Sequence, residues 1–331
     1  AGAFGNRLGL DAAYKFARGD EVVSTNGTPA RLSRPLDWLV VADHSDNMGF
    51  FPDMIGGAPH ILSDPTGRDW YDRINRGEGV GVALELIGLF SQGKFPEALV
   101  YKPDSAPYKS AWARTVDAAE RFNDPGAFTA FIGYEWTSLV TGNNMHRVVI
   151  YRDGADRGGQ MVPFTTIPPE GSTNPRDLWQ WLDRYEQRTG GDVLAIAHNG
   201  NLANGIMFPL RAQYDGRRLD DDYVTERARW EPLYEATQIK GDGETHPFLS
   251  PEEELHGQYR RVADQALQTT QTSLGVVENH GSSIAEMGAW SRRLRTDPDF
   301  RGLCFQNGLD HAVVMRGALS VAVLGSQPLP V

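Results

Sequence analysis

Residues 193–201 of the chain read VLAIAHNGN, five apolar residues that lead directly into a histidine and an asparagine. A near-continuous apolar run of this length is typical of a strand that is buried on both faces, as in a parallel sheet covered by helices. The same pattern recurs at residues 36–44, which end with an aspartate and a histidine, and at residues 128–135, which end with a glutamate. We therefore expect several strands that each end at a polar side chain.

Helical segments lie between these runs and complete an α/β alternation. Residues 172–189 carry an N-terminal cap signal and apolar residues at helical spacing, and Gly190-Gly191 follow as a stop. Residues 107–122 and 81–90 are two more predicted helices, and residues 250–253, SPEE, are expected to open a fourth. Alternating strands and helices of this kind predict a mostly parallel sheet of βα units.

Two segments depart from this alternation. Residues 155–176 are rich in glycine and proline and predict a long surface loop. Loops of that length are uncommon in compact domains unless they are functional. After about residue 255 the pattern weakens, and the sequence predicts no clear elements there.

The composition narrows the class of protein. The chain has 331 residues, of which 40% are hydrophobic, so it can bury a sizeable core. Its net charge is −11, whereas a nucleic-acid-binding protein normally has a basic surplus, so we expect no nucleic-acid partner.

The single cysteine, Cys304, excludes an internal disulfide framework and any multi-thiolate zinc site. No apolar run is long enough to predict a membrane span, and the first residues do not resemble a signal peptide.

The side chains at the predicted strand ends are all possible metal ligands. These residues are Asp43, His44, Glu135, His198 and Glu235. Functional side chains of βα barrels and open α/β sheets collect at the carboxyl ends of the strands. Imidazole nitrogens and carboxylate oxygens together suit Zn, Mn or Fe. A lone histidine at a strand end is more often structural, but four strand ends that carry a histidine or an acid favour a site.

Other polar residues near these ends leave alternatives open. His146 opens the apolar run 146–151, and it is either a further ligand or an ordinary hairpin residue. Asn199 and Asn201 either contact a substrate or cap the next helix. Lys240 and Asp242 either orient an anionic substrate or belong to a solvated loop.

Several long motifs resemble one family, the bacterial domain-of-unknown-function 3604 family. That family is similar in turn to the polymerase-and-histidinol-phosphatase (PHP) hydrolases. The resemblance covers about residues 3–255. Its motifs are FGNRLG (4–9), LSRPLDWLVVADHSDNMG (32–49), FTAFIGYEWTS (128–138), NNMHR (143–147), RDLWQWL (176–182), LAIAHNGNL (194–202) and RWEPLYEATQIKGDGETHPFLSP (229–251).

The similarity to PHP enzymes implies a distorted (β/α)7 TIM-like barrel with divalent metal ions at the carboxyl ends of its strands. Such ions activate water for the hydrolysis of phosphate esters. Asp43-His44 resembles the Asp-His motif that closes an early strand, and Glu135 resembles the carboxylate that bridges the ions. His146 and His198 resemble the ligands that follow, and Glu235 resembles a carboxylate at a later strand end. The resemblance thus implies that Asp43, Glu135 and His198 act in catalysis.

Two motifs of the resembled family differ in this sequence. The family begins with a His-x-His-Thr strand just before FGN, so we expect a barrel that lacks its first strand. It ends the barrel with Asp-x-His, whereas this sequence has the adjacent pair Asp310-His311, which we take as substitute ligands. We accordingly expect a PHP-like barrel over residues 1–255 and a divergent end of the barrel, or a tail, over residues 256–331.

Two hypotheses for function arise from the sequence. The first is a metal-dependent hydrolase, of phosphoesterase type, that acts on a small molecule such as a phosphoester. The second is a barrel without catalytic competence that serves as a binding or scaffold module, because one ligand motif is missing and another is altered. The resemblance also suggests that many members of the family are exported, to the periplasm or beyond, but the compartment stays open.

Overall fold

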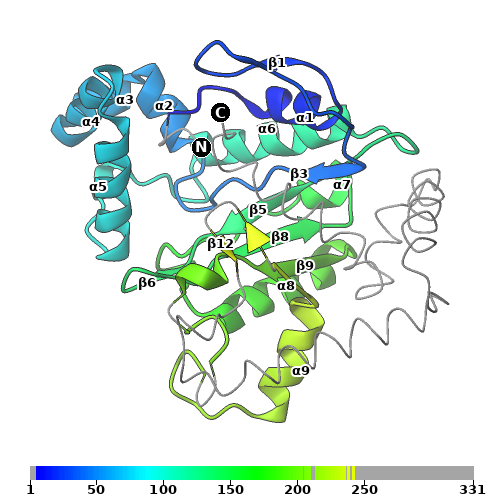
Figure 1. Ribbon diagram of the computed structural model, residues 1–331. Coiled ribbons are helices and arrows are strands. Elements are labelled where there is room, and N and C mark those ends of the chain that lie inside the picture. The colour runs from blue at the N-terminus through cyan, green and yellow to red at the C-terminus, as the bar shows by residue number, and fades with distance from the viewer. Residues whose placement is uncertain (1–4, 204, 210–212, 236, 239–240, 243–331) are drawn as a thin grey trace.

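The computed structural model describes residues 5–203, 205–209, 213–235, 237–238 and 241–242 (Figure 1). The predicted helix from residue 250, Lys240 and the pair Asp310-His311 lie outside the described residues. So do all residues of the predicted segment 256–331.

A four-stranded sheet forms the centre of the molecule. Its strands, in order across the sheet, are β10 (Leu233–Tyr234), β9 (Val193–Ala197), β8 (Arg147–Tyr151) and β5 (Gly133–Trp136). A second pair, β3 (Trp38–Val40) and β4 (Thr129–Phe131), is parallel, and β4 runs into β5 with only Ile132 between them. The predicted runs 36–44, 128–135 and 193–201 thus each contain strands, and the residues of β3, β4, β5, β8 and β9 are all buried.

The direction of β8 differs from the prediction of a mostly parallel sheet. β8 is antiparallel to both of its neighbours, β5 and β9, whereas β9 pairs in parallel with β10. The reason is the short connection between Glu135 and His146, which contains the small antiparallel pair β6 (Leu139–Val140) and β7 (Asn143–Asn144). A connection of that length allows only a hairpin, since a parallel crossover needs a dozen residues or more.

Helices cover the strands, and the three helices that were predicted within the described residues are present as α5 (Gly79–Ser91), α6 (Ala106–Phe122) and α8 (Pro175–Thr189). α6 packs on β4 and, with α1 (Leu10–Ala17), lies beside β3 at the top of Figure 1. α8 and α9 (Asp221–Trp230) pack on β9 on the other side of the strands. α8 begins where the Asn174 side chain accepts the Arg176 N–H, and it ends at Gly190, whose φ of 66° suits a glycine.

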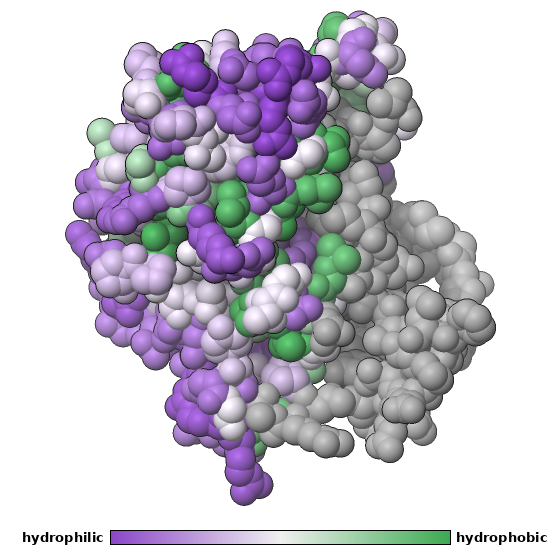
Figure 2. Space-filling model, turned by 90° about the vertical axis from the view of Figure 1, so that its left-hand side faces the viewer, coloured by the Kyte–Doolittle hydropathy of each residue, from purple (hydrophilic) through white to green (hydrophobic). Residues whose placement is uncertain are grey.

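A helical excursion follows β3 and was predicted only in its last part. It consists of α2 (Phe50–Gly56), α3 (Pro59–Ser63), α4 (Pro65–Asn75) and α5 (Gly79–Ser91). These helices form the left side of Figure 1, and the same face in Figure 2 is mostly hydrophilic with scattered hydrophobic residues. Along the described residues no helix combines the length and the apolar character that a bilayer span requires.

The remaining elements are short. They are β1 (Val22–Val23), β2 (Pro29–Ala30), the 3-10 helices η2 (Glu97–Leu99) and η3 (Gly200–Leu202), α7 (Ala155–Gly158), β11 (Thr237–Gln238) and β12 (Gly241–Asp242). The predicted loop 155–176 is indeed irregular apart from α7 and the first residues of α8. The strands of the described part form open sheets, and the barrel stays a prediction.

A buried ion-pair cluster ties β8 to the helices behind it. The Arg147 side chain is fully buried and donates through Nε to Glu231 Oε1 at 2.9 Å. Arg227 from α9 lies 3.0 Å from Glu231 Oε2, and Trp179 from α8 donates to Oε1 at 2.9 Å. Burial raises the pKa of the Glu231 carboxyl, but Arg147 and Arg227 outweigh that effect and lower it. The carboxylate is therefore charged and compensates two guanidinium groups.

Replacing Glu231 by glutamine should lower the free energy of unfolding by about 3–5 kcal/mol, because it leaves the buried Arg147 charge uncompensated. Equilibrium unfolding in urea measures this difference. The matched control is Asp69→Asn, which removes the acid from an ion pair with Arg73. The side chain of Asp69 is 56% exposed. That change should cost less than about 1 kcal/mol.

The pH dependence gives a second measure of the same cluster. Because folding lowers the pKa of Glu231, its contribution is present above the unfolded-state pKa of about 4.3 and disappears as the pH falls through the lower folded-state value. The difference in the free energy of unfolding between the wild type and Glu231→Gln should therefore decrease as the pH falls. Equal costs for Glu231→Gln and Asp69→Asn at neutral pH would contradict this account.

Candidate metal centre

The register of the strands brings the predicted site residues to one edge of the sheet. His44, four residues after β3, forms a parallel bridge with Glu135 of β5. The Glu135 N–H donates to Asp43 O at 2.8 Å, and the Ser45 N–H donates to Glu135 O at 2.8 Å. His198, directly after β9, donates its N–H to His146 O at 2.9 Å. Because β8 is antiparallel, His146 at its beginning lies level with the carboxyl ends of the neighbouring strands.

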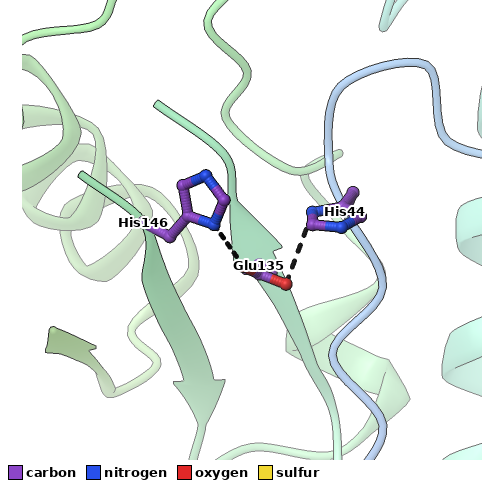
Figure 3. A group of neighbouring side chains, drawn as sticks. All are labelled: His44, Glu135 and His146. Carbon is purple, nitrogen blue, oxygen red and sulfur yellow. Dashed lines mark hydrogen bonds and ion pairs between the residues drawn. The ribbon is translucent and has the colours of Figure 1, made fainter. Parts of the chain in front are cut away.

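The Glu135 carboxylate lies at the centre of this group, between two histidines (Figure 3). Its Oε1 atom is 2.7 Å from His146 Nδ1, and its Oε2 atom is 3.4 Å from His44 Nδ1. His198 approaches from the same side as His146, with Nε2 3.6 Å from Oε1. The two oxygens of one carboxylate thus face different imidazoles.

His44, Glu135 and His146 can hold a divalent metal ion. One ligand atom from each lies within 4.8 Å of the others. Two imidazole nitrogens and one carboxylate oxygen are a donor set that suits zinc and other first-row transition metals. The prediction of a metal cofactor is confirmed to this extent, and the choice among Zn, Mn and Fe stays a prediction.

The electrostatics of the group also fit a cation. Glu135 and His146 are buried, and burial alone would raise the pKa of Glu135. His44, His198 and His146 reverse this and lower the pKa of Glu135 below its ordinary value, so the carboxylate is ionised. Desolvation lowers the pKa of His44. The charges of His146 and His198 lower it further, and together these effects outweigh Glu135, which raises it. A neutral imidazole beside an ionised carboxylate is the protonation state that metal binding requires.

Glu235 lies behind His198 and fixes its ring. Both oxygens of Glu235 are 2.9 Å from His198 Nδ1, and Oε2 also accepts the Asn199 N–H at 3.0 Å. Histidine ligands commonly donate the second ring nitrogen to a carboxylate, which sets the tautomer and the orientation of the ring. With Nδ1 held in this way, Nε2 is the atom of His198 that faces Glu135.

Asn199 belongs to the same group, and its backbone is unusual. Its φ of 62° lies in the left-handed region, which a non-glycine residue seldom adopts. It occupies the N-cap position of η3 without a side-chain cap hydrogen bond. Its amide Nδ2 instead lies 3.2 Å from His146 Nδ1. Of the two alternatives, the capping hydrogen bond is absent, and the side chain turns toward the candidate ligands.

The other predicted site residues do not belong to the cluster of ligand atoms that His44, Glu135 and His146 form among the described residues. Asp43 lies half-buried next to His44, and burial, with a contribution from Glu135, raises the pKa of its carboxyl. It is not one of the three residues whose ligand atoms cluster. The backbone of Asn201 lies in η3 and that of Asp242 in β12, while their side chains are outside the described part.

Sequence reasoning missed Thr137, which supports the centre. Its hydroxyl Oγ1 is 2.8 Å from His44 Nδ1 and donates to Glu135 O at 3.0 Å. The residue lies two positions after Glu135, on the turn out of β5, where an isolated threonine carries no distinctive signal. A periodicity of two along the strand is the one hint that it shares a face with Glu135.

The comparisons with known proteins support the family and nothing finer. The chain belongs to the family described as protein of unknown function (DUF3604), whose sequence profile matches residues 1–282. No curated protein and no solved structure is similar enough to this chain to be matched. The similarity to PHP enzymes stays a prediction from the sequence motifs.

Glu135→Gln should abolish tight metal binding. The change keeps the shape of the side chain but removes the charge that the three histidines surround, so Zn²⁺ affinity should fall by more than about 100-fold. Competition against a chromogenic chelator measures the affinity, and Glu97→Gln, at an exposed acid in η2, is the control. Unchanged affinity in Glu135→Gln would exclude this centre.

Glu235→Gln should have a smaller effect on the same affinity. An amide still accepts from His198 Nδ1 but loses the charge, and losses of outer-sphere partners typically cost roughly 10- to 100-fold in affinity. The same competition assay gives the value, and far-ultraviolet circular dichroism checks the fold. If Glu235 is instead a direct ligand, as we expected from its position at a strand end, the loss of affinity should equal that of Glu135→Gln.

Proposed function

We propose that this protein is a metal-dependent hydrolase of phosphate esters, similar to the PHP enzymes. The observation that supports the proposal is the cluster of His44, Glu135 and His146 at the edge of the sheet, with His198 adjoining it. The family to which the chain belongs does not by itself specify an activity. The proposal therefore stands on the donor set and on the motif resemblance.

The chain's own residues would supply an ordered and charged binding site. Glu135 would span two positions, with Oε2 toward His44 and Oε1 toward His146 and His198. Divalent metal ions, when bound there, supply Lewis-acid polarisation of a phosphoryl group and activation of water. Asp43 is proposed as a further ligand, and Asp310 and His311 as substitute ligands.

Access to the centre comes from the side of His44. Its side chain is 44% exposed, whereas those of Glu135, His146 and His198 are nearly inaccessible. A small substrate would approach there, where Asn199 and, by their position in the chain, Asn201, Lys240 and Asp242 are proposed to contact it. The net charge of −11 disfavours a long anionic polymer, because its approach would be slowed by repulsion.

Hydrolysis of 4-nitrophenyl phosphate and bis(4-nitrophenyl) phosphate, with Zn²⁺, Mn²⁺ or Fe²⁺ added to chelator-treated protein, tests the proposal. We expect turnover with at least one metal, and a loss of more than roughly 100-fold in His146→Ala, because the metal provides several kcal/mol of transition-state stabilisation. Glu97→Gln, with its intact centre, should retain full activity.

The same assay separates the two hypotheses of function. Metal binding without turnover of either ester would favour the binding or scaffold module. Turnover that survives both the chelator and His146→Ala would show that the activity lies elsewhere.

A further inference from the structure

A cavity of about 780 Å³ lies away from the metal centre, beside α6 and α8. Tyr134 and Glu135 are consecutive in β5, so their side chains point to opposite faces of the sheet. Trp181, which lines the cavity, packs edge-on against Tyr134 with ring centroids 6.0 Å apart. The cavity, which we call the α6–α8 groove, is therefore on the face opposite to Glu135.

The floor of the α6–α8 groove is apolar and aromatic. Phe164 and Trp181 are buried and stacked, with ring centroids 6.3 Å apart and an interplanar angle of 27°. Met161, Val162 and Pro163 continue the lining beside them. An apolar and partly aromatic lining of this kind favours a ligand with a planar apolar body.

This floor is held in place by hydrogen bonds on its other side. The Phe164 N–H donates to the Tyr134 hydroxyl at 3.3 Å. Two residues further on, the Thr166 N–H and Oγ1 donate to Asp46 Oδ1 at 2.9 and 2.8 Å. The loop is thus ordered before any ligand arrives, which reduces the entropy cost of binding.

Basic side chains surround this floor. Lys109 from α6 and Arg184 and Arg188 from α8 line the groove, and none of the three forms an ion pair with a described residue. Two acids, Asp104 and Glu170, line it as well, from two separate segments. The groove thus has more basic than acidic lining residues, although the net charge of the chain is −11.

The two arginines make the stronger case for an anion. Arg184 and Arg188 are one helical turn apart on α8, where like charges repel and destabilise the helix. An anion that both guanidinium groups contact would convert this repulsion into charge-assisted hydrogen bonds, for which arginine has the matching geometry. The volume of the groove is within the range of small-ligand sites.

We propose that the α6–α8 groove binds a small organic anion with a planar apolar body and a carboxylate, sulfonate or phosphate group. The apolar body lies on Phe164 and Trp181, and the anionic group faces Arg184 and Arg188. This binding site does not depend on the metal centre, so it stands whether or not the protein is a hydrolase.

Calorimetric titration of the full chain with 2-naphthalenesulfonate, 2-naphthoate and 2-naphthyl phosphate tests the proposal. Chelator is present in every titration, so that the metal centre does not compete for the anion. We expect saturable binding of at least one anion at a single site with a dissociation constant below about 1 mM. The uncharged 2-naphthalenemethanol should bind roughly tenfold more weakly or not at all.

Two double variants locate the site. Arg184→Gln with Arg188→Gln should weaken anion binding by roughly tenfold or more, since both charge-assisted contacts are lost. Arg68→Gln with Arg114→Gln removes the same charge from exposed arginines outside the groove and should leave the affinity unchanged. Failure of all three anions to bind, or equal affinities in the two double variants, would overturn the proposal.

Discussion

The described site depends on a single buried carboxylate, that of Glu135. A carboxylate in a protein interior is unstable in its charged form unless cations or hydrogen-bond donors compensate it. Here the compensation comes from imidazoles carried by different strands, His44 on one side and His146 and His198 on the other. Their positions are fixed by the sheet, because His44 and Glu135 are bridged and His198 donates its N–H to His146. The same constraint that stabilises the charge therefore brings together side chains that could hold a metal ion.

The antiparallel direction of β8 connects this site to the core behind it. His146 and Arg147 are consecutive, so the strand sends the first toward the candidate ligands and the second to the opposite face. There Arg147 pairs with Glu231 in a cluster that also engages α8 and α9. His198 has a comparable support, because Glu235 holds its Nδ1 atom. Both histidines are thus positioned by contacts outside the ligand set, as precise metal sites require.

The sequence predicts the strands, and several polar residues that meet at their ends, because buried strands and strand-end polar residues leave a local pattern. The runs that end at His44, Glu135 and His198 are each found as strands, and these residues do meet. The antiparallel direction of β8 was not predicted, because an apolar run carries no information on strand direction, which here depends on the length of the hairpin. The helices over residues 50–75 were missed, since their cap at Asp64 and their glycines and prolines resemble a loop. The role of Glu235 toward His198 depends on side-chain geometry, which no spacing reveals.

The most direct measurement of the central claim is anomalous X-ray diffraction from crystals grown with Zn²⁺ or Mn²⁺, with data collected on both sides of the metal absorption edge. We predict an anomalous peak within coordination distance of Glu135 and of the imidazoles of His44 and His146, about 2.0–2.2 Å from each ligand atom for zinc. We also expect Glu235 to remain against His198 Nδ1 rather than on the metal. Anomalous peaks confined to other parts of the surface, with the Glu135 carboxylate still in direct contact with His146, would contradict the claim.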